Sequence, residues 1–402
     1  MARLLTIDEL TPAQRQRGQI ALMLSTFFSW GGFFMVIPLM AVHYVDHLGW
    51  AAGTLGIILA VRQFLQQGLT TIFGILADRV GPRILISIGM LIRSVGFAAM
   101  AYAEDFWPVL GAAVIVAVGG SMFESPIQAS IAALTYPEER QRFYARIGMI
   151  GGIGTTVGTQ IGAMLIGYDF SLVCLGAAVA FFMVFLAMTI VMPSISASIG
   201  GDTALNGVRA VMRDWTFIRY VGIVTGYWFA WTQFGLTVTL AAVAITGTER
   251  AVSWIYLVNA VVTIALGYTL PRLLERWLTP LQMQIMGITT IGVGLLLIGL
   301  AGGIPGVLLA AGVFAIGAVM ARPGQETVLA NLASPSARGT YFGFAALALA
   351  VGGGLGNYLG GVVYDLGQGG ASPLPWIVFG CIAFTTALFL WLNRERFSVV
   401  RT

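Results

Sequence analysis

A few ionisable side chains fall deep inside apolar segments of the chain, and they are the first candidates for chemistry. They are Arg62, Arg93, Glu124, Arg322 and Glu326. A charge in the interior of a membrane costs at least about 2.5–3.5 kcal/mol, so we expect each side chain to have a partner or to face a wet cavity. Arginine keeps its proton in proteins and the chain contains no lysine. The two glutamates are therefore the predicted proton carriers.

An internal repeat sets Glu124 opposite Arg322, and Gln128 opposite Glu326, at matching depths of two apolar segments. One interpretation is an ion pair between the two halves of the repeat. A carboxyl that is ionised beside a cation and neutral elsewhere would couple proton movement to a change of shape. A permanent bridge that holds the halves together would look the same in sequence. The predicted proton-coupling and charge network comprises Glu124, Glu326, Arg322, Arg62 and Arg93, with Glu124 as the first choice.

The composition indicates that membrane helices position these residues. Of the 402 residues, 58% are hydrophobic and only 9% are charged, and the mean hydropathy is +0.88. A soluble domain with this balance would not stay in solution. Each span needs about 20 apolar residues and a short connection, so the length fits roughly twelve spans and no separate soluble domain.

The apolar runs predict an all-α polytopic membrane protein with twelve transmembrane helices. The predicted spans are residues 19–45, 52–77, 84–103, 107–135, 143–167, 171–192, 217–245, 252–274, 280–302, 305–333, 339–364 and 374–392. The longest gap, 193–216, has the composition of a polar linker, so we expect six-helix bundles over 1–192 and 217–402. Arginines gather in the loops on the side of the N-terminus, which predicts that both termini and the linker are cytoplasmic.

The repeat relates the two predicted bundles. The superposed residues are Leu134 with Leu332, Pro137 with Pro335, Arg140 with Arg338, and Gly154, Gly158 and Gly162 with Gly352, Gly356 and Gly360. An even number of spans in each half predicts a pseudo-two-fold axis along the membrane normal, with a substrate path between the halves. Glycine at every fourth position is consistent with close helix packing and equally with a hinge.

One compact polar loop, residues 74–83, joins the second and third spans. Its predicted gating residues are Gly74, Asp78, Arg79, Gly81 and Arg83. Asp78 would end a helix, where the dipole is itself negative, so its charge is unfavourable by about 0.3–1 kcal/mol without a partner. The free amides of the span that begins near residues 334–338 would suit it. We predict a conformational latch, and a loop that only fixes topology is the alternative.

This loop resembles the signature loop of the major facilitator superfamily in the residues Gly74, Leu76, Ala77, Asp78, Arg79, Gly81 and Arg83. The resemblance covers essentially the whole chain, and a weaker echo lies at residues 267–276. Further stretches, at 32–38, 49–52, 59–68 and 364–367, are similar to the twelve-span drug:proton antiporters and, among these, to the MdtH-type multidrug exporters. The resemblance implies the major facilitator fold, proton-coupled efflux by alternating access, and a location in the bacterial cytoplasmic (inner) membrane.

The chain departs from the antiporter pattern in two places. Residues 151–158 carry the glycines of the span-five signature without its proline, and Ser25 stands where a carboxylate is expected. Both departures bear on proton exchange and leave the implied fold unchanged.

The predicted substrate cavity is aromatic with a few amides. Its residues are Phe27, Phe34, Gln63, Gln66, Tyr227, Trp228, Trp231 and Gln233. Spans one and seven are repeat partners, and their aromatic walls would bind lipophilic or cationic compounds by stacking and cation–π attraction. Packing or lipid-facing aromatics are the alternative. Arg62 and its glutamines would bind an anionic group or hydrogen-bond to neighbouring helices.

We therefore predict a secondary transporter that exchanges a lipophilic or cationic small molecule for protons and acts as a monomer in the bilayer. The alternative is an uptake or export carrier for a metabolite, an anionic compound or a lipid. The motifs of metalloproteases and serine hydrolases are missing from the sequence, so no enzyme is predicted. No cofactor or metal is predicted, since His43, Asp46 and His47 sit at a helix end. The arginines are spread over loops, which argues against nucleic acid as a partner.

Overall fold

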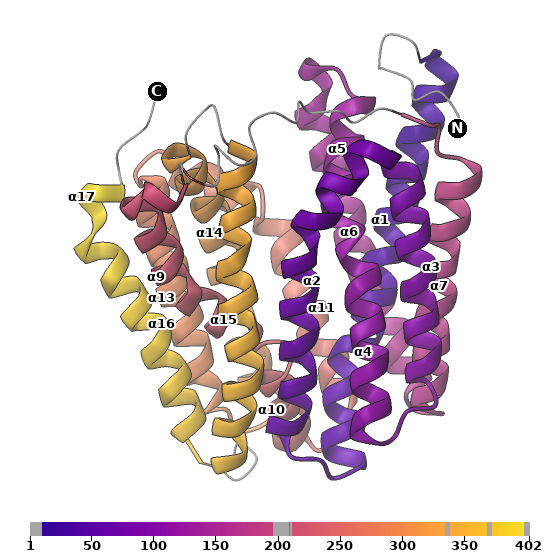
Figure 1. Ribbon diagram of the computed structural model, residues 1–402. Helices are drawn as coiled ribbons and strands as arrows, with labels where there is room; N and C mark the ends of the chain where they lie inside the picture. Colours follow the sequence, from indigo (N-terminus) through magenta and orange to yellow (C-terminus); the bar gives the residue numbers. More distant parts are fainter. Residues whose placement is uncertain (1–9, 196–208, 210, 334–337, 368–371, 398–402) are drawn as a thin grey trace. The chain divides into compact units, whose positions relative to one another are not determined.

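The computed structural model describes residues 10–195, 209, 211–333, 338–367 and 372–397, which are helical over nearly their whole length (Figure 1). The first helices are α1 (Pro12–Met40), the π-helical η2 (Ala41–His47), α2 (Ala52–Val80), α3 (Pro82–Met100), α4 (Phe106–Ser121), α5 (Glu124–Leu134), α6 (Pro137–Leu165) and α7 (Phe170–Ile190). The later helices are α9 (Trp215–Thr232), α10 (Thr237–Thr246), α11 (Arg250–Leu266), α12 (Thr269–Leu274), α13 (Pro280–Ile298), α14 (Ile304–Leu332), α15 (Arg338–Leu366), α16 (Leu374–Leu392) and α17 (Arg394–Phe397).

Each predicted span corresponds to one helix or to two consecutive helices. Within the described residues, nine helical stretches are long and apolar enough to cross a membrane, and α11 is a shorter apolar helix. The all-α membrane architecture expected from the hydropathy pattern is confirmed.

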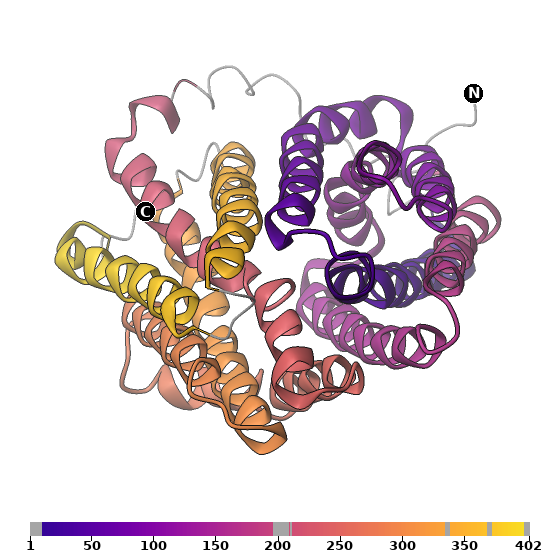
Figure 2. The ribbon, with the colours of Figure 1, turned by 90° about the horizontal axis from the view of Figure 1, so that it is seen from below.

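Contacts divide the chain into two compact units. The first unit comprises Met1–Met40 and Val61–Gly200, and the second comprises Ala41–Ala60 and Gly201–Thr402. The sequence placed residues 41–60 in the first bundle, whereas their contacts group η2 and the start of α2 with the second unit. In the first unit α1 packs on α6 and α7, and α3 packs on α4 and α7. In the second, α13 packs on α14 and α16, and α9 packs on α15 and α16 (Figures 1 and 2).

Two predicted spans are interrupted by proline. The span expected at 107–135 divides into α4 and α5 at Met122 and Phe123, because Pro126 has no N–H to donate to the Met122 carbonyl one turn earlier. The span expected at 252–274 divides into α11 and α12 in the same way, one turn before Pro271. The first interruption places Glu124 at the N-terminus of α5, where the helix dipole favours a negative charge.

The repeated glycines let helices approach closely in both units. In the first unit, a Cβ added at Gly154, Gly158 or Gly162 of α6 would collide with Phe27, Gly31 or Met35 of α1. In the second, Gly352, Gly356 and Gly360 of α15 stand against Thr225, Phe229 and Gln233 of α9. These contacts support the packing interpretation of the glycine pattern. The hinge interpretation stays a prediction.

Candidate functional site

A buried cationic centre occupies the first unit. The side chains of Arg62 on α2 and Arg93 on α3 are only 6% and 5% exposed. Their guanidinium carbons lie 5.2 and 5.1 Å from the centroid of the Phe33 ring on α1, and Arg93 also lies 4.6 Å from the Phe181 ring on α7. The two cations thus face one aromatic ring, which is a favourable arrangement for a desolvated guanidinium.

Amides rather than carboxylates accept the hydrogen bonds of Arg62. Its Nη1 donates to Gln66 Oε1 at 3.1 Å and its Nη2 donates to Gln63 Oε1 at 3.2 Å. Among the described residues, no acceptor reaches the buried Nε of Arg62 or of Arg93. Gly120 of α4 makes room for Gln66 and Arg93, since a Cβ there would contact both side chains. The glutamines Gln63 and Gln66 of α2 are therefore grouped around Arg62.

The charge of Glu124 acts on the buried cationic centre through Arg93. The Glu124 side chain is exposed at the start of α5, and it interacts with Arg93, which also experiences the like charge of Arg62. The sequence proposed Arg322 as the partner of Glu124. In the structure the Arg322 Nε lies 3.2 Å from Oε1 of Glu326, one turn along α14. Residues four apart on a helix are neighbours, so this pair needs no tertiary contact. The pair of Arg322 with Glu124 stays a prediction.

The second unit contains a pocket beside the Arg322–Glu326 pair. Its volume is about 370 Å³, and it is lined by Trp228 of α9, by Gln325, Glu326 and Leu329 of α14, and by Phe342, Ala345, Ala346 and Leu349 of α15. Trp231 packs edge-on against Trp228 with the ring centroids 5.5 Å apart. The pocket thus combines an indole face, a carboxylate and an apolar wall, and it contains two residues that the sequence predicted, Trp228 and Glu326.

Two residues predicted for the cavity are packed inside the second unit. Tyr227 and Gln233 are each only 1% exposed and are not among the residues that line the pocket. The Gln233 Nε2 donates to the carbonyls of Phe229 and Gly356, both at 2.9 Å. This amide therefore joins α9 to α15 where α9 ends. In the first unit Phe34 stacks on Trp30 with centroids 5.7 Å apart, and Phe27 packs edge-on against Phe28.

The polar loop is described only in part. Gly81 has φ +86°, a conformation that favours glycine, and it precedes the first turn of α3. Arg83 donates to Ser194 Oγ at 3.2 Å and to the carbonyl of Thr189 near the end of α7. Gly74 stands against the Ser125 hydroxyl, where a Cβ would collide. The side chains of Asp78 and Arg79 and residues 334–337 lie outside the described parts, so the predicted latch remains a prediction.

The latch was predicted between the end of α2 and the start of α15. At the other ends of these two helices, a carboxylate binds a helix N-terminus. The carboxylate of Asp365, near the end of α15, accepts the N–H of Ala52 at 2.9 Å and that of Gly53 at 2.8 Å at the start of α2. We call this contact the Asp365 clasp. Nearby, His47 Nε2 and Glu249 Oε1 are 2.6 Å apart. A negative charge at a helix N-terminus is favourable, so the clasp stabilises the attachment of residues 52 and 53 to the second unit.

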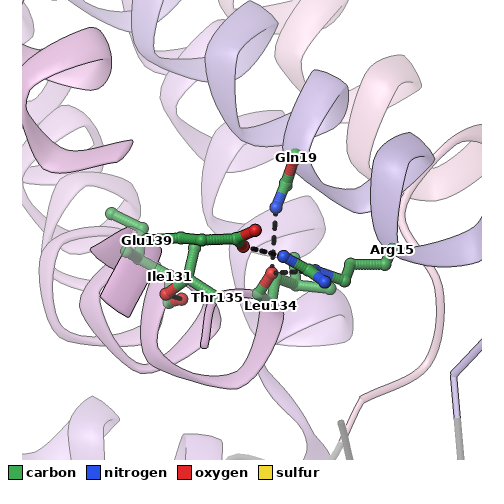
Figure 3. Close-up of polar contacts among 6 residues, drawn as sticks. All are labelled: Arg15, Gln19, Ile131, Leu134, Thr135 and Glu139. Atoms are coloured by element: carbon green, nitrogen blue, oxygen red, sulfur yellow. Dashed lines mark hydrogen bonds and ion pairs between the residues drawn. The ribbon is translucent and has the colours of Figure 1, made fainter. Parts of the chain in front are cut away.

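A second polar anchor fixes the corner between α5 and α6 in the first unit (Figure 3). Arg15 of α1 pairs with Glu139 of α6, and its Nε donates to the carbonyl of Leu134 at 3.2 Å. Gln19 Nε2 donates to the same carbonyl at 3.0 Å. Leu134 is the last residue of α5, so these donors satisfy a carbonyl that the helix leaves unpaired.

The arrangement of helices and the matching family model define the class of this protein. The model of the Major Facilitator Superfamily matches residues 22–278. A solved POT family transporter, in complex with 5-aminolevulinic acid, has a TM-score of 0.81 over 95% of this chain and 97% of its own at 13% identity, which shows a shared fold. The chain belongs to the major facilitator superfamily and is a multi-pass membrane transporter.

Two curated relatives are similar over nearly their whole length. Multidrug resistance protein MdtH of Aeromonas hydrophila subsp. hydrophila is 36% identical over 377 residues, which cover 94% of this chain and 95% of that protein. The protein of the same name in Salmonella typhimurium is 36% identical over 377 residues, which cover 94% of each chain. The resemblance seen in the residues of the polar loop is thereby confirmed at the level of the family.

Proposed function

We propose that this transporter moves lipophilic cations out of the cell in exchange for protons, by alternating access. The observation that carries the proposal is the pocket of the second unit, where the Trp228 indole and the Glu326 carboxylate line the same apolar space. An aromatic face and a carboxylate together attract an organic cation, and the apolar wall favours a lipophilic one. The MdtH relatives, named for multidrug resistance, support this substrate class.

Glu326 provides the coupling in this proposal. The bound cation, the proton and the guanidinium of Arg322 all compete for one carboxylate. A cation that enters the pocket displaces the proton, and a proton that binds from the opposite side displaces the cation. One proton that moves down about 100 mV releases about 2.3 kcal/mol, which is enough to drive a gradient on the order of 40-fold. Glu124, at the positive N-terminus of α5 beside Arg93, is the second proposed proton site.

The Asp365 clasp is a contact within the second unit, between α15 and the start of α2. It joins the ends of α2 and α15 that lie opposite the polar loop and the start of α15. We propose that the clasp fixes the start of α2 during the transport cycle, and that the predicted contact of Asp78 with the start of α15 forms in one state of that cycle.

A second candidate function is the transport of an anionic compound. The observation that favours it is the buried pair Arg62 and Arg93, whose like charges act on each other and whose hydrogen bonds, for Arg62, go to neutral amides. An anion bound between the two guanidinium groups would relieve that repulsion.

The experiment is transport in proteoliposomes with an imposed pH gradient and a lipophilic cationic dye. We expect wild-type protein to move the dye against its gradient, and Glu326→Gln to reduce this movement at least tenfold. Trp228→Ala weakens dye binding by about 2- to 30-fold, which corresponds to a cation–π contribution of about 0.5–2 kcal/mol. Glu104→Gln, at an exposed carboxylate between α3 and α4, is the matched control and leaves transport unchanged.

Uphill dye movement by Glu326→Gln at the wild-type rate would overturn the proposal. Gradient-driven uptake of an anionic dye that is lost in Arg62→Gln, with no movement of the cationic dye, would instead establish the second candidate.

A further inference from the structure

A long groove runs along the second unit between α9 and α16, away from the residues that line the pocket. Its volume is about 680 Å³, and apart from Arg219 and two threonines its lining is aliphatic, aromatic or glycine, with Cys381 and Phe389 on the α16 side. The lining residues of α16 recur at intervals of three and four, from Ile377 to Phe389, so they form one face of that helix. The groove is therefore a mainly apolar depression along one face of α16.

The length of the groove along α16 is close to the thickness of one leaflet of a bilayer. From Ile377 to Phe389 the helix rises about 18 Å. The hydrocarbon core of a membrane is about 30 Å thick, so one leaflet occupies about 15 Å. An extended acyl chain of an ordinary phospholipid matches this length and this apolar lining.

A positive charge marks one end of the groove. Arg219 lies in the second turn of α9 and is exposed, and its Nη1 donates to Asn393 Oδ1, just after α16, at 3.3 Å. Among the described residues Arg219 has no carboxylate partner, so its charge is available to a ligand. Arg394 follows at the same end and stacks on the half-exposed Trp391 at 4.6 Å. Tryptophan and arginine together are typical of the headgroup level of a membrane.

We propose that this groove binds one anionic phospholipid, with an acyl chain between α9 and α16 and the headgroup phosphate on Arg219. A guanidinium is well suited to phosphate, since it offers several donors in one plane. A chain bound in this way would cover Gly222 and lie beside Gly226. The second glycine has a separate role, because a Cβ there would collide with the Thr386 hydroxyl where the two helices touch.

Gly222 provides a selective test of the apolar part of the site. A Cβ at this position meets no atom within 4 Å, so a side chain begins here in open space at the groove. Gly222→Phe therefore occupies the space of the acyl chain, and Gly222→Leu does so with less bulk. Gly111→Phe on α4 is the matched control, because Gly111 is also exposed and open within 4 Å.

The test is native mass spectrometry of the full-length protein after equilibration with equal amounts of phosphatidylglycerol and phosphatidylcholine in detergent. We expect wild type to retain phosphatidylglycerol preferentially. Arg219→Ala lowers this preference about fivefold, as expected for the loss of one arginine beside an anionic lipid. Gly222→Phe and Gly222→Leu lower the retention of both lipids. Arg276→Ala, which removes an exposed arginine elsewhere in the same unit, and Gly111→Phe behave as wild type.

Wild-type lipid retention in Arg219→Ala and in both Gly222 variants would overturn the proposal. So would a dimer that dissociates in Gly222→Phe, since the groove would then accommodate a second copy of the chain. Thermal unfolding confirms which variants are folded before they are compared, and Arg219→Gln and Gly222→Leu serve where the larger change unfolds the protein.

Discussion

The two units differ in how they hold the charged side chains of their long apolar helices. In the first, Arg62 and Arg93 are buried, share the face of Phe33 and are surrounded by amides and glycines. In the second, Arg322 and Glu326 neutralise each other on one helix, and both side chains are 60% exposed. The halves therefore have the same architecture and different electrostatics: a cationic centre fixed by packing, and an ion pair that a ligand can open.

This difference assigns separate tasks to the two units in our proposal. A guanidinium that stays charged and buried is suited to hold a constant potential, which acts on Glu124 through Arg93. An exposed carboxylate beside a pocket can exchange its cation partner at low cost. We therefore place cation and proton exchange at Glu326 and a supporting role at the buried arginines.

The largest expected effect on stability comes from Phe33. Phe33→Ala removes the ring that both guanidinium groups face, and we expect it to lower the stability of the protein by about 3 kcal/mol. Thermal unfolding in detergent measures the change. Trp228→Ala is the comparison in the other unit, where the indole lines a pocket and packs on Trp231, and we expect it to lower the unfolding temperature less than Phe33→Ala does. Equal losses in the two variants would contradict the distinction between a packed centre and an open one.

An intermediate effect is expected at the Asp365 clasp. Asp365→Ala removes the acceptor of two backbone N–H groups at the start of α2, a loss of about 1–2 kcal/mol. Hydrogen exchange in the first turn of α2 should become about 5- to 30-fold faster, as measured by mass spectrometry of peptides that cover residues 52–60. Asp365→Asn keeps one acceptor and shows a smaller change. Unchanged exchange in both variants would mean that the clasp does not hold α2.

The smallest effect is expected at the exposed ion pair. Arg322→Gln removes a salt bridge between two side chains that are each 60% exposed, and such pairs contribute about 0.3–0.5 kcal/mol. We expect an unfolding temperature within the error of wild type, together with tighter binding of a cationic dye, because the dye no longer competes with a guanidinium. A large loss of stability would show that the pair is structural.

Hydropathy predicts the helices well, because the cost of exposing polar groups to lipid fixes where a span can begin and end. The last predicted span, 374–392, coincides with α16, and the span expected at 305–333 differs from α14 by one residue at each end. Hydropathy averaged over a window of residues does not change noticeably when one proline lacks its backbone N–H. The division of α4 from α5 was for this reason not predicted, although Pro126 is visible in the sequence.

The candidate site was predictable in its residues and less so in its contacts. Residues deep in a span are few and costly, so Arg62, Arg93 and Glu326 stand out in the sequence. Which groups touch them depends on tertiary packing. Phe33 was one aromatic among several in its span, and no local signal linked it to two arginines on other helices. The repeat suggested a partner for Arg322 on another helix, and the ion pair that the structure describes joins Arg322 to Glu326, one turn away on the same helix.

The Asp365 clasp is another contact that depends on tertiary packing and could not be predicted from the sequence. The physical argument that a carboxylate on one helix would bind the free amides of another was made for Asp78 and the start of α15. The structure contains such a contact between Asp365 and the start of α2. The sequence contained the signal, an aspartate near the predicted end of one span and a small-residue start of another, but nothing in it brings the two ends together.

The most direct test of the central claim is proton release on substrate binding. A lipophilic cationic dye is added to purified protein in a weak acidic buffer, in which protons compete with the Arg322 guanidinium for the Glu326 carboxylate, and the pH is followed with an indicator. If cation and proton compete for Glu326, wild type releases protons as it binds the dye, and Glu326→Gln binds the dye without release. Dye binding to wild type with no change in pH would contradict exchange at this carboxylate.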